Sequence, residues 1–201
     1  MKLIVITTET FFAGEAEAIN LLFENGMEVL HVRKPLASMP ETEMFIGQIN
    51  ENFHPRIVIH DFYELTKSYD LKGVHLNRRN QGICMEEIMH SRLSISRSCH
   101  SFKEVSESHF CDYVFLSPIF DSISKVGYRQ GFTSDQLSES TIDKRVIALG
   151  GITADNIHLA REYGFGGVAV IGALWSDFAS NRDVNALLER FNVLKMKCVR
   201  V

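Results

Sequence analysis

Two glycine-ended segments near the C-terminus carry the clearest chemical signal in the sequence. Residues 148–152 read Ala-Leu-Gly-Gly-Ile, and residues 166–173 read Gly-Gly-Val-Ala-Val-Ile-Gly-Ala. Each apolar run ends in glycine and leads into a helix-like stretch, so backbone N–H groups can approach an anion closely. On adjacent parallel strands two such turns predict a phosphate-binding cup. The structural alternative is that these glycines simply end strands in tight turns.

The elements that must position these turns form an alternating series. Eight short β-branched runs are separated by helical stretches, and several runs are continuously apolar, as in parallel strands covered on both faces. The runs occupy residues 3–7, 29–33, 56–60, 73–76, 93–96, 113–117, 146–149 and 167–171. This alternation predicts an α/β fold, a single (β/α)8 TIM barrel domain over residues 1–201. A doubly wound open sheet is the alternative.

Helix signals lie between the strands. Residues 15–23 have apolar side chains at helical spacing and stop at Asn25-Gly26, which is typical of a helix C-cap. Ser101 and Glu104 match a capping box. Further helices are expected at residues 42–49, 63–69 and 183–194, and one begins at 153–156. The polar, glycine-punctuated stretch 118–134 is long enough to be a functional loop over the barrel mouth.

Polar residues follow the predicted strands at the end where barrel enzymes place their active sites. They are His31, Arg33 and Lys34; His60 and Asp61; Asn77, Arg78, Arg79 and Asn80; Ser96, Ser98 and His100; and Ser122, Ser124 and Lys125.

The chemistry of this set is mainly anion binding. Arg33, Lys34 and Lys125, with the glycine cup, could hold more than one phosphate group. Asp61 suits a hard cation, with Asn80 as a neutral second ligand. Each residue also has a structural alternative. Asp61 could cap a helix, the two arginines Arg78 and Arg79 could lie in solvent, His31 and His60 could be core histidines, and Ser98 and His100 could cap the next helix.

Composition narrows the class of protein. The 201 residues carry a net charge of −4, which argues against a general binder of nucleic acid or anionic membranes. The apolar N-terminal run is too short for a signal peptide, and no run is long enough to cross a bilayer, so a cytoplasmic location is expected. The four cysteines, Cys84, Cys99, Cys111 and Cys198, form no CxxC pair and are expected to be reduced thiols.

Taken together, seven motifs resemble the thiamine phosphate synthase family, which includes thiazole tautomerases of the same fold. They run through almost the whole chain: His31-Val32-Arg33-Lys34-Pro35, His60-Asp61, Gly-Val-His-Leu-Asn-Arg-Arg-Asn at 73–80, Ser98-Cys99-His100-Ser101, Ser-Pro-Ile-Phe-Asp-Ser-Ile-Ser-Lys at 117–125, Gly150-Gly151-Ile152 and Ile171-Gly172. The resemblance implies an enzyme that joins hydroxymethylpyrimidine diphosphate to thiazole phosphate, releasing diphosphate.

The resemblance also implies residue roles. Arg33 and Lys125 would hold the diphosphate, Asp61 would bind a bridging Mg2+, and Ser98 would lie near the diphosphate and the pyrimidine. The expected catalytic residues are Arg33, Ser98, His100 and Lys125. His31 and His60 are expected at the pyrimidine end, and Lys34 is expected to bind substrate. The thiazole phosphate would be held by Ser122, Ser124, Gly151, Ile171 and Gly172. Family barrels often pair, so a homodimer is a candidate assembly.

Departures from the family pattern keep two other functions open. His31 and His60 stand where the family has Gln and Asn, Pro35 replaces a lysine, and Asn80 replaces the second metal acid. Loss of that carboxylate should weaken Mg2+ binding. These changes fit a metal-independent tautomerase that uses His100 as acid and base on a carboxythiazole phosphate. A non-catalytic thiazole-phosphate binding protein is the third possibility.

Overall fold

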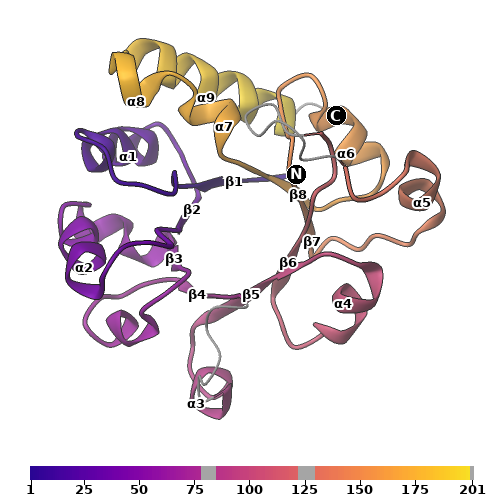
Figure 1. The fold of residues 1–201 in the computed structure, drawn as a ribbon, viewed down its shortest axis with the longest axis horizontal. Helices are drawn as coiled ribbons and strands as arrows, with labels where there is room; N and C mark the ends of the chain where they lie inside the picture. The colour runs from indigo at the N-terminus through magenta and orange to yellow at the C-terminus, as the bar shows by residue number, and fades with distance from the viewer. Residues whose placement is uncertain (78–84, 122–129, 200–201) are drawn as a thin grey trace.

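A closed barrel of eight parallel strands forms the centre of the molecule (Figure 1). The computed structural model describes residues 1–77, 85–121 and 130–199. The strands follow one another around the ring in chain order, and β8 closes the barrel by pairing in parallel with β1. They are β1 (Lys2–Ile6), β2 (Val29–Val32), β3 (Ile57–Ile59), β4 (Gly73–Leu76), β5 (Ser94–Cys99), β6 (Tyr113–Leu116), β7 (Val146–Leu149) and β8 (Gly167–Val170). The predicted TIM barrel and its eight strands are confirmed.

Helices surround the barrel on the outside (Figure 1). They are α1 (Glu15–Glu24), α2 (Met39–Gly47), α3 (Met85–Met89), α4 (Phe102–Glu107), α5 (Ser134–Glu139), α6 (Ile157–Glu162), α7 (Gly172–Trp175), α8 (Phe178–Asn181) and α9 (Val184–Val199), with 3-10 helices η1 (Glu51–Arg56) and η2 (Tyr63–Lys67). Among the described residues, no helix combines the length and apolar character that a membrane span requires.

Local signals explain where the helices begin, and two expectations need correction. The helix predicted from residue 42 begins at Met39, because Ser38 and Glu41 form a capping box around Pro40. The stretch predicted at 63–69 is the 3-10 helix η2. Ser101 caps α4 as predicted and accepts from the Glu104 N–H, but the Glu104 carboxylate accepts from the backbone of His100 instead of Ser101.

Alternation along each strand separates two environments. Leu30, Val74 and Val114 point outward into the main core between the barrel and its helices, whereas the intervening residues point inward. Inside the barrel, β1, β6, β7 and β8 contribute a small apolar cluster of Ile4, Ile6, Tyr113, Phe115, Ile147 and Ala169. On the other side of the interior, β2, β4 and β5 place three polar residues that are fully buried, His31, His75 and Ser96. Half of the barrel interior is therefore polar.

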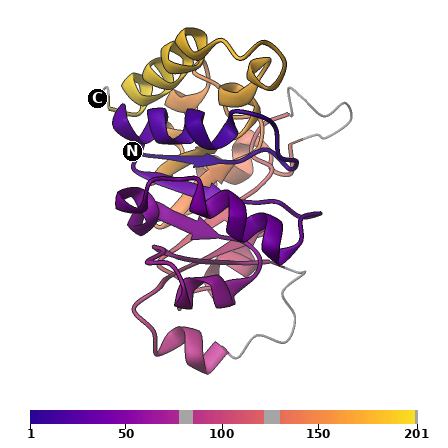
Figure 2. The same cartoon turned by 90° about the vertical axis from the view of Figure 1, so that its left-hand side faces the viewer.

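The N-terminus and the end of α9 lie together at one end of the barrel (Figure 2). The N-terminal ammonium group donates to the carbonyl of Cys198, near the end of α9, at 3.1 Å. All strands start at this end because they are parallel, so their C-terminal ends lie at the opposite end of the barrel. That opposite end carries the site.

Candidate active site

A cavity of about 600 Å³ lies at the C-terminal ends of the strands. This volume is within the usual range for small-molecule sites. Of the residues expected at the site, eight line it: Arg33, His60, Asn77, Ser98, His100, Gly151, Ile171 and Gly172. Three others, His31, Lys34 and Asp61, are described but are not among its lining residues. Arg78, Arg79, Asn80, Ser122, Ser124 and Lys125 lie outside the described residues.

One wall of the cavity is made by the turn after β7. Gly150 and Gly151 both have positive φ, 96° and 64°, which L-residues with a side chain rarely adopt. A Cβ atom on Gly151 would lie 2.3 Å from the backbone oxygen of Asp121. Only glycine therefore fits where this turn packs against the loop that follows β6. Ile171 and Gly172, at the start of α7, bring a second stretch of backbone to the same cavity.

Positive charge at the cavity comes from Arg33, just beyond β2. Its backbone N–H donates to the hydroxyl of Thr7 at 2.9 Å, which fixes the loop against the end of β1. Its guanidinium lies 3.0 Å from the carboxylate of Glu9, and the two side chains are 27% and 48% exposed. Because exposed ion pairs are weak, an anionic ligand in the cavity can compete with Glu9 for this arginine.

Lys34 is not brought to the cavity, contrary to its expected role in binding substrate. Its ammonium is buried against the carboxylate of Glu15. The rings of Phe11 and Phe45 lie beside the ammonium, at 4.7 Å and 5.2 Å from their centroids. This lysine holds the loops after β1 and β2 together behind the cavity wall.

His100 faces the cavity with a defined tautomer. Its Nδ1 lies 3.0 Å from the backbone oxygen of Ser117. A carbonyl oxygen can only accept, so Nδ1 carries the proton and Nε2 carries the lone pair. His100 can therefore act as a base through Nε2.

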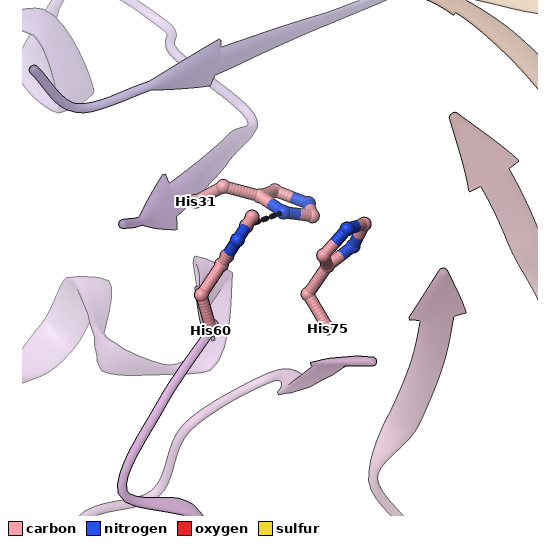
Figure 3. A group of neighbouring side chains, drawn as sticks. All are labelled: His31, His60 and His75. Carbon is pink, nitrogen blue, oxygen red and sulfur yellow. Dashed lines mark hydrogen bonds between the residues drawn. The ribbon is translucent and has the colours of Figure 1, made fainter. Parts of the chain in front are cut away.

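Three histidines gather in the polar half of the barrel interior (Figure 3). Nδ1 of His31 lies 2.9 Å from Nε2 of His60, and the rings of His60 and His75 stack with centroids 4.1 Å apart. Burial, together with the neighbouring His75 and Lys72, holds the pKa of His31 well below its usual value, so this imidazole is neutral. Only His60 of the three lines the cavity.

A metal ion is one use for such a cluster, since one nitrogen from each ring lies within 4.8 Å of the others. The ring geometry argues against it. The ring planes of His60 and His75 are inclined by only 21° and stacked 4.1 Å apart, so their in-plane lone pairs lie in separate, nearly parallel planes and do not converge well on one ion. The inner nitrogens of His31 and His60 are instead bonded to each other. The described cluster is a hydrogen-bonded network.

The acidic residue expected to bind a hard cation, Asp61, lies in the loop after β3. Asp61 is partly exposed and follows the cavity residue His60 in the chain. Its carboxylate has the oxygen ligands that Mg2+ prefers. Asn80, expected as a second ligand, lies outside the described residues.

Several lining residues were not expected from the sequence. Glu9 and Arg97 both contribute to the cavity wall. Arg97 lies in β5 between Ser96 and Ser98, in a strand that is longer than predicted because it extends to Cys99. The unusual polarity of that strand was the available signal.

Comparison with known proteins agrees with this geometry. Residues 3–174 match the family model for thiamine monophosphate synthase. The thiamine-phosphate synthase of Bacteroides fragilis strain YCH46 is 26% identical over 187 residues, covering 87% of this chain and 92% of the relative. That of Dictyoglomus turgidum is 23% identical over 203 residues, covering 94% and 91%.

Solved structures give the same result. The crystal structure of thiamine phosphate pyrophosphorylase from Bacteroides thetaiotaomicron is 40% identical, with a TM-score of 0.85 over 98% of this chain and 97% of that one. The thiamine phosphate pyrophosphorylase from Pyrococcus furiosus, 22% identical with a TM-score of 0.74 over 98% and 96%, shares the fold. With a family match that spans most of the barrel, the chain belongs to the thiamine monophosphate synthase family, whose work is thiamine biosynthesis.

Proposed function

We propose that this chain is a transferase that joins hydroxymethylpyrimidine diphosphate to thiazole phosphate, forming thiamine phosphate and releasing diphosphate. The observation that carries the proposal is the composition of the cavity walls. Arg33 after β2, Ser98 in β5 and the glycine turns after β7 and β8 all line this cavity. Anion-binding groups from several strand ends therefore surround one cavity, which can take two anionic ligands.

The reaction needs charge stabilisation more than a base. The bond between the pyrimidine methylene carbon and the diphosphate oxygen breaks, and its electron pair leaves with the diphosphate. The thiazole nitrogen then forms the new C–N bond to that carbon. Arg33 neutralises the charge that develops on the leaving oxygen, and the Ser98 hydroxyl also belongs to a residue that lines the cavity. The backbone at Gly151, Ile171 and Gly172 orients the thiazole phosphate.

We propose Mg2+ as the cofactor. Mg2+ commonly binds through one or two carboxylates together with substrate phosphate oxygens, and Asp61 fits that donor chemistry. Asp61 would hold the ion with Asn80, and the ion would supply positive charge to the departing diphosphate.

A direct assay tests the function. Both substrates are mixed with the protein, with Mg2+ or with EDTA, and thiamine phosphate is measured in a single turnover. We expect product with Mg2+ and its loss with EDTA. Failure to form product with Mg2+, while the thiazole phosphate is shown to bind, would overturn the synthase proposal.

One observation favours a second candidate function. The free lone pair on Nε2 of His100 at the cavity wall suits a thiazole tautomerase, which moves a ring proton without a metal. Carboxythiazole phosphate incubated in D2O would then exchange its ring proton with EDTA present, and His100→Asn would stop the exchange. Exchange that is equal in both proteins would exclude this role.

We propose a homodimer in the cytoplasm as the working assembly, with small phosphorylated molecules as its ligands. Large apolar side chains remain exposed around α2, including Leu36 at 86% and Met44 at 62%, and a second copy would cover them. Light scattering at micromolar concentration tests the dimer, and Met44→Glu should shift the mass to that of a monomer.

A further inference from the structure

The turn that follows β8 is a small unit of backbone at the edge of the cavity. Ile171 and Gly172 line the cavity, and the chain then makes the single turn of α7. The N–H groups of Leu174 and Trp175 donate to the carbonyl of Ile171, at 3.1 Å and 3.0 Å. One helical turn has little structure of its own, so its position depends on the side chains that hold it.

Two side chains hold this turn from different directions. On the barrel side, the indole N–H of Trp175 donates to the carbonyl of Ile6, the last residue of β1, at 2.9 Å. On the outer side, where α9 lies beside α7 (Figure 1), Nε of Arg190 donates to the carbonyl of Leu174 at 3.0 Å. The residues that line the cavity include neither Trp175 nor Arg190. Both can therefore act on a ligand only from behind the turn.

The guanidinium of Arg190 carries a charge that this one bond does not explain. Its Nη2 atom is buried and has no hydrogen-bond partner within the part of the chain that the structure describes. The ion pairs recorded there also leave Arg190 without a carboxylate. A buried charged group without a partner is costly and calls for an explanation. An anion bound close by would lower that cost.

The geometry of α7 places this charge near the proposed phosphate site. An α-helix rises about 1.5 Å per residue, so the carbonyl oxygen of Leu174 lies roughly 7 Å from the N–H of Gly172. Since Nε of Arg190 is 3.0 Å from that oxygen, the charge lies within about 10 Å of the backbone that lines the cavity. At such a distance one positive charge should shift the second pKa of a phosphate by about 0.3–1 unit.

We propose that Arg190 is a positioning residue for the phosphate of the thiazole substrate, which holds the turn beginning at Ile171 and places an unpaired positive charge behind it. This inference rests on the proposed function, because it takes the phosphate to bind at Gly151, Ile171 and Gly172. Arg190 stabilises the bound phosphate without touching it. The dianion gains more than the monoanion, since the attraction grows with the charge of the ligand.

Phosphorus NMR of the bound thiazole phosphate tests the effect of the charge. The second pKa of a phosphate monoester is about 6, and the 31P shift of the ligand, followed from about pH 5 to pH 8 with protein in excess, measures it in the bound state. In Arg190→Met, which removes the charge but keeps an aliphatic stem, we expect this pKa to rise by about 0.3–1 unit. In Arg190→Lys, which keeps the charge, it should stay within about 0.2 unit of the unmodified protein. Equal pKa values in the unmodified protein and Arg190→Met would overturn the proposal.

Two further variants separate the charge from a general loosening of the structure. Arg161→Met is the matched control, because Arg161 also donates to backbone carbonyls of α9, those of Lys197 and Cys198, at the end of the barrel away from the cavity. It should change neither the affinity nor the pKa of the bound phosphate. Trp175→Phe removes the other bond to the turn without changing any charge, so it should weaken binding and leave that pKa unchanged. A pKa rise in either variant as large as that in Arg190→Met would contradict the proposal.

Isothermal titration measures the binding itself. In Arg190→Met, at a temperature where thermal unfolding shows the variant to be folded, we expect Kd for thiazole phosphate to rise about threefold to tenfold. An unchanged Kd would overturn the proposal. If the unmodified protein forms no thiamine phosphate but the pKa difference is found, the synthase proposal fails and the role of Arg190 stands. Thiazole phosphate that does not bind the unmodified protein would overturn both.

Discussion

The ammonium of Lys34 lies 2.7 Å from both carboxylate oxygens of Glu15, and each side chain is only 1% exposed. The pair joins the residue after β2 to the first turn of α1. Burial raises the pKa of Glu15 although Lys34 opposes the shift, and burial lowers the pKa of Lys34 although Glu15 opposes it. Each charge is therefore costly to bury, and the pair is held because each partner compensates the other.

Removal of one partner should be far worse than removal of both. Lys34→Met leaves a buried carboxylate without its cation, and we expect it to lower the free energy of unfolding by about 3–5 kcal/mol. The double variant Glu15→Gln with Lys34→Met should recover most of that loss. Urea denaturation of the three proteins measures both effects. Equal stability of the single and double variants would show that the charges are not coupled.

The strands could be predicted from local patterns because each carried its own signal, whereas the short helices α3, α5 and α8 were not predicted. The runs at 73–76 and 146–149 coincide with β4 and β7, since continuous apolar runs bounded by polar residues are typical of parallel strands. The helix around residues 15–23 ends at Asn25 as the Asn-Gly pair predicted. Boundaries failed where capping determined them, as at Ser38.

The site could be predicted only in part. Proximity to a strand end placed Arg33 and His60 correctly at the cavity, but gave the same expectation for Lys34. Lys34 differs from Arg33 and His60 in the direction of its side chain and in having a long-range partner that holds it away from the cavity. Glu15 lies 19 positions from Lys34, and nothing in local spacing reveals that pairing. The hydrogen bond between Tyr113 and His31 was missed for the same reason, because it spans 82 positions of the sequence.

Glu9 should restrain the substrate-binding arginine in the free protein. Because the carboxylate of Glu9 lies 3.0 Å from the Arg33 guanidinium, a diphosphate must displace it. We expect Glu9→Gln to lower KM for the pyrimidine diphosphate about twofold to fivefold, since exposed pairs contribute roughly 0.2–1 kcal/mol. Arg33→Gln should instead reduce kcat/KM by about a hundredfold or more. Steady-state kinetics of both variants tests these two expectations. A higher KM in Glu9→Gln would contradict the restraint of Arg33 by Glu9.

Asp61 should be required for the proposed Mg2+ dependence. We expect Asp61→Ala to lower kcat by about a hundredfold or more, because an uncompensated diphosphate is a poor leaving group. Excess Mg2+ should restore part of the activity. The control is Asp70→Ala, which removes an exposed carboxylate shortly before β4 and should leave turnover unchanged. Full turnover in Asp61→Ala would show that the Asp61 carboxylate has no role in the mechanism.

The buried cysteines should be chemically inert while the protein is folded. Burial raises the pKa of Cys111 to about 11, and also raises the pKa values of Cys99 and Cys198. At pH 8 only roughly one Cys111 side chain in a thousand is then the reactive thiolate. In a Cys84→Ser background, which leaves the three described thiols, we expect iodoacetamide to label none within an hour and all in 6 M guanidinium. Mass spectrometry gives the count, and rapid labelling of Cys111 in the native protein would contradict its burial.

Gly151 should be required both for the backbone conformation of the turn after β7 and for binding of the thiazole phosphate. In Gly151→Ala, the new Cβ atom would lie 2.3 Å from the backbone oxygen of Asp121. The alanine would also have to keep a backbone φ of 64°. We expect Gly151→Ala to lower stability by about 1–3 kcal/mol and to weaken binding of the thiazole phosphate, because the turn must move away from the cavity. Gly47→Ala is the matched control, since its Cβ would meet only the Tyr69 hydroxyl at 3.7 Å. Thermal unfolding measures the stability, and isothermal titration measures the binding. The titration is run below the melting temperature of the variant, so that a loss of binding is not caused by unfolding. If Gly151→Ala binds thiazole phosphate as tightly as Gly47→Ala, the phosphate is held elsewhere in the cavity.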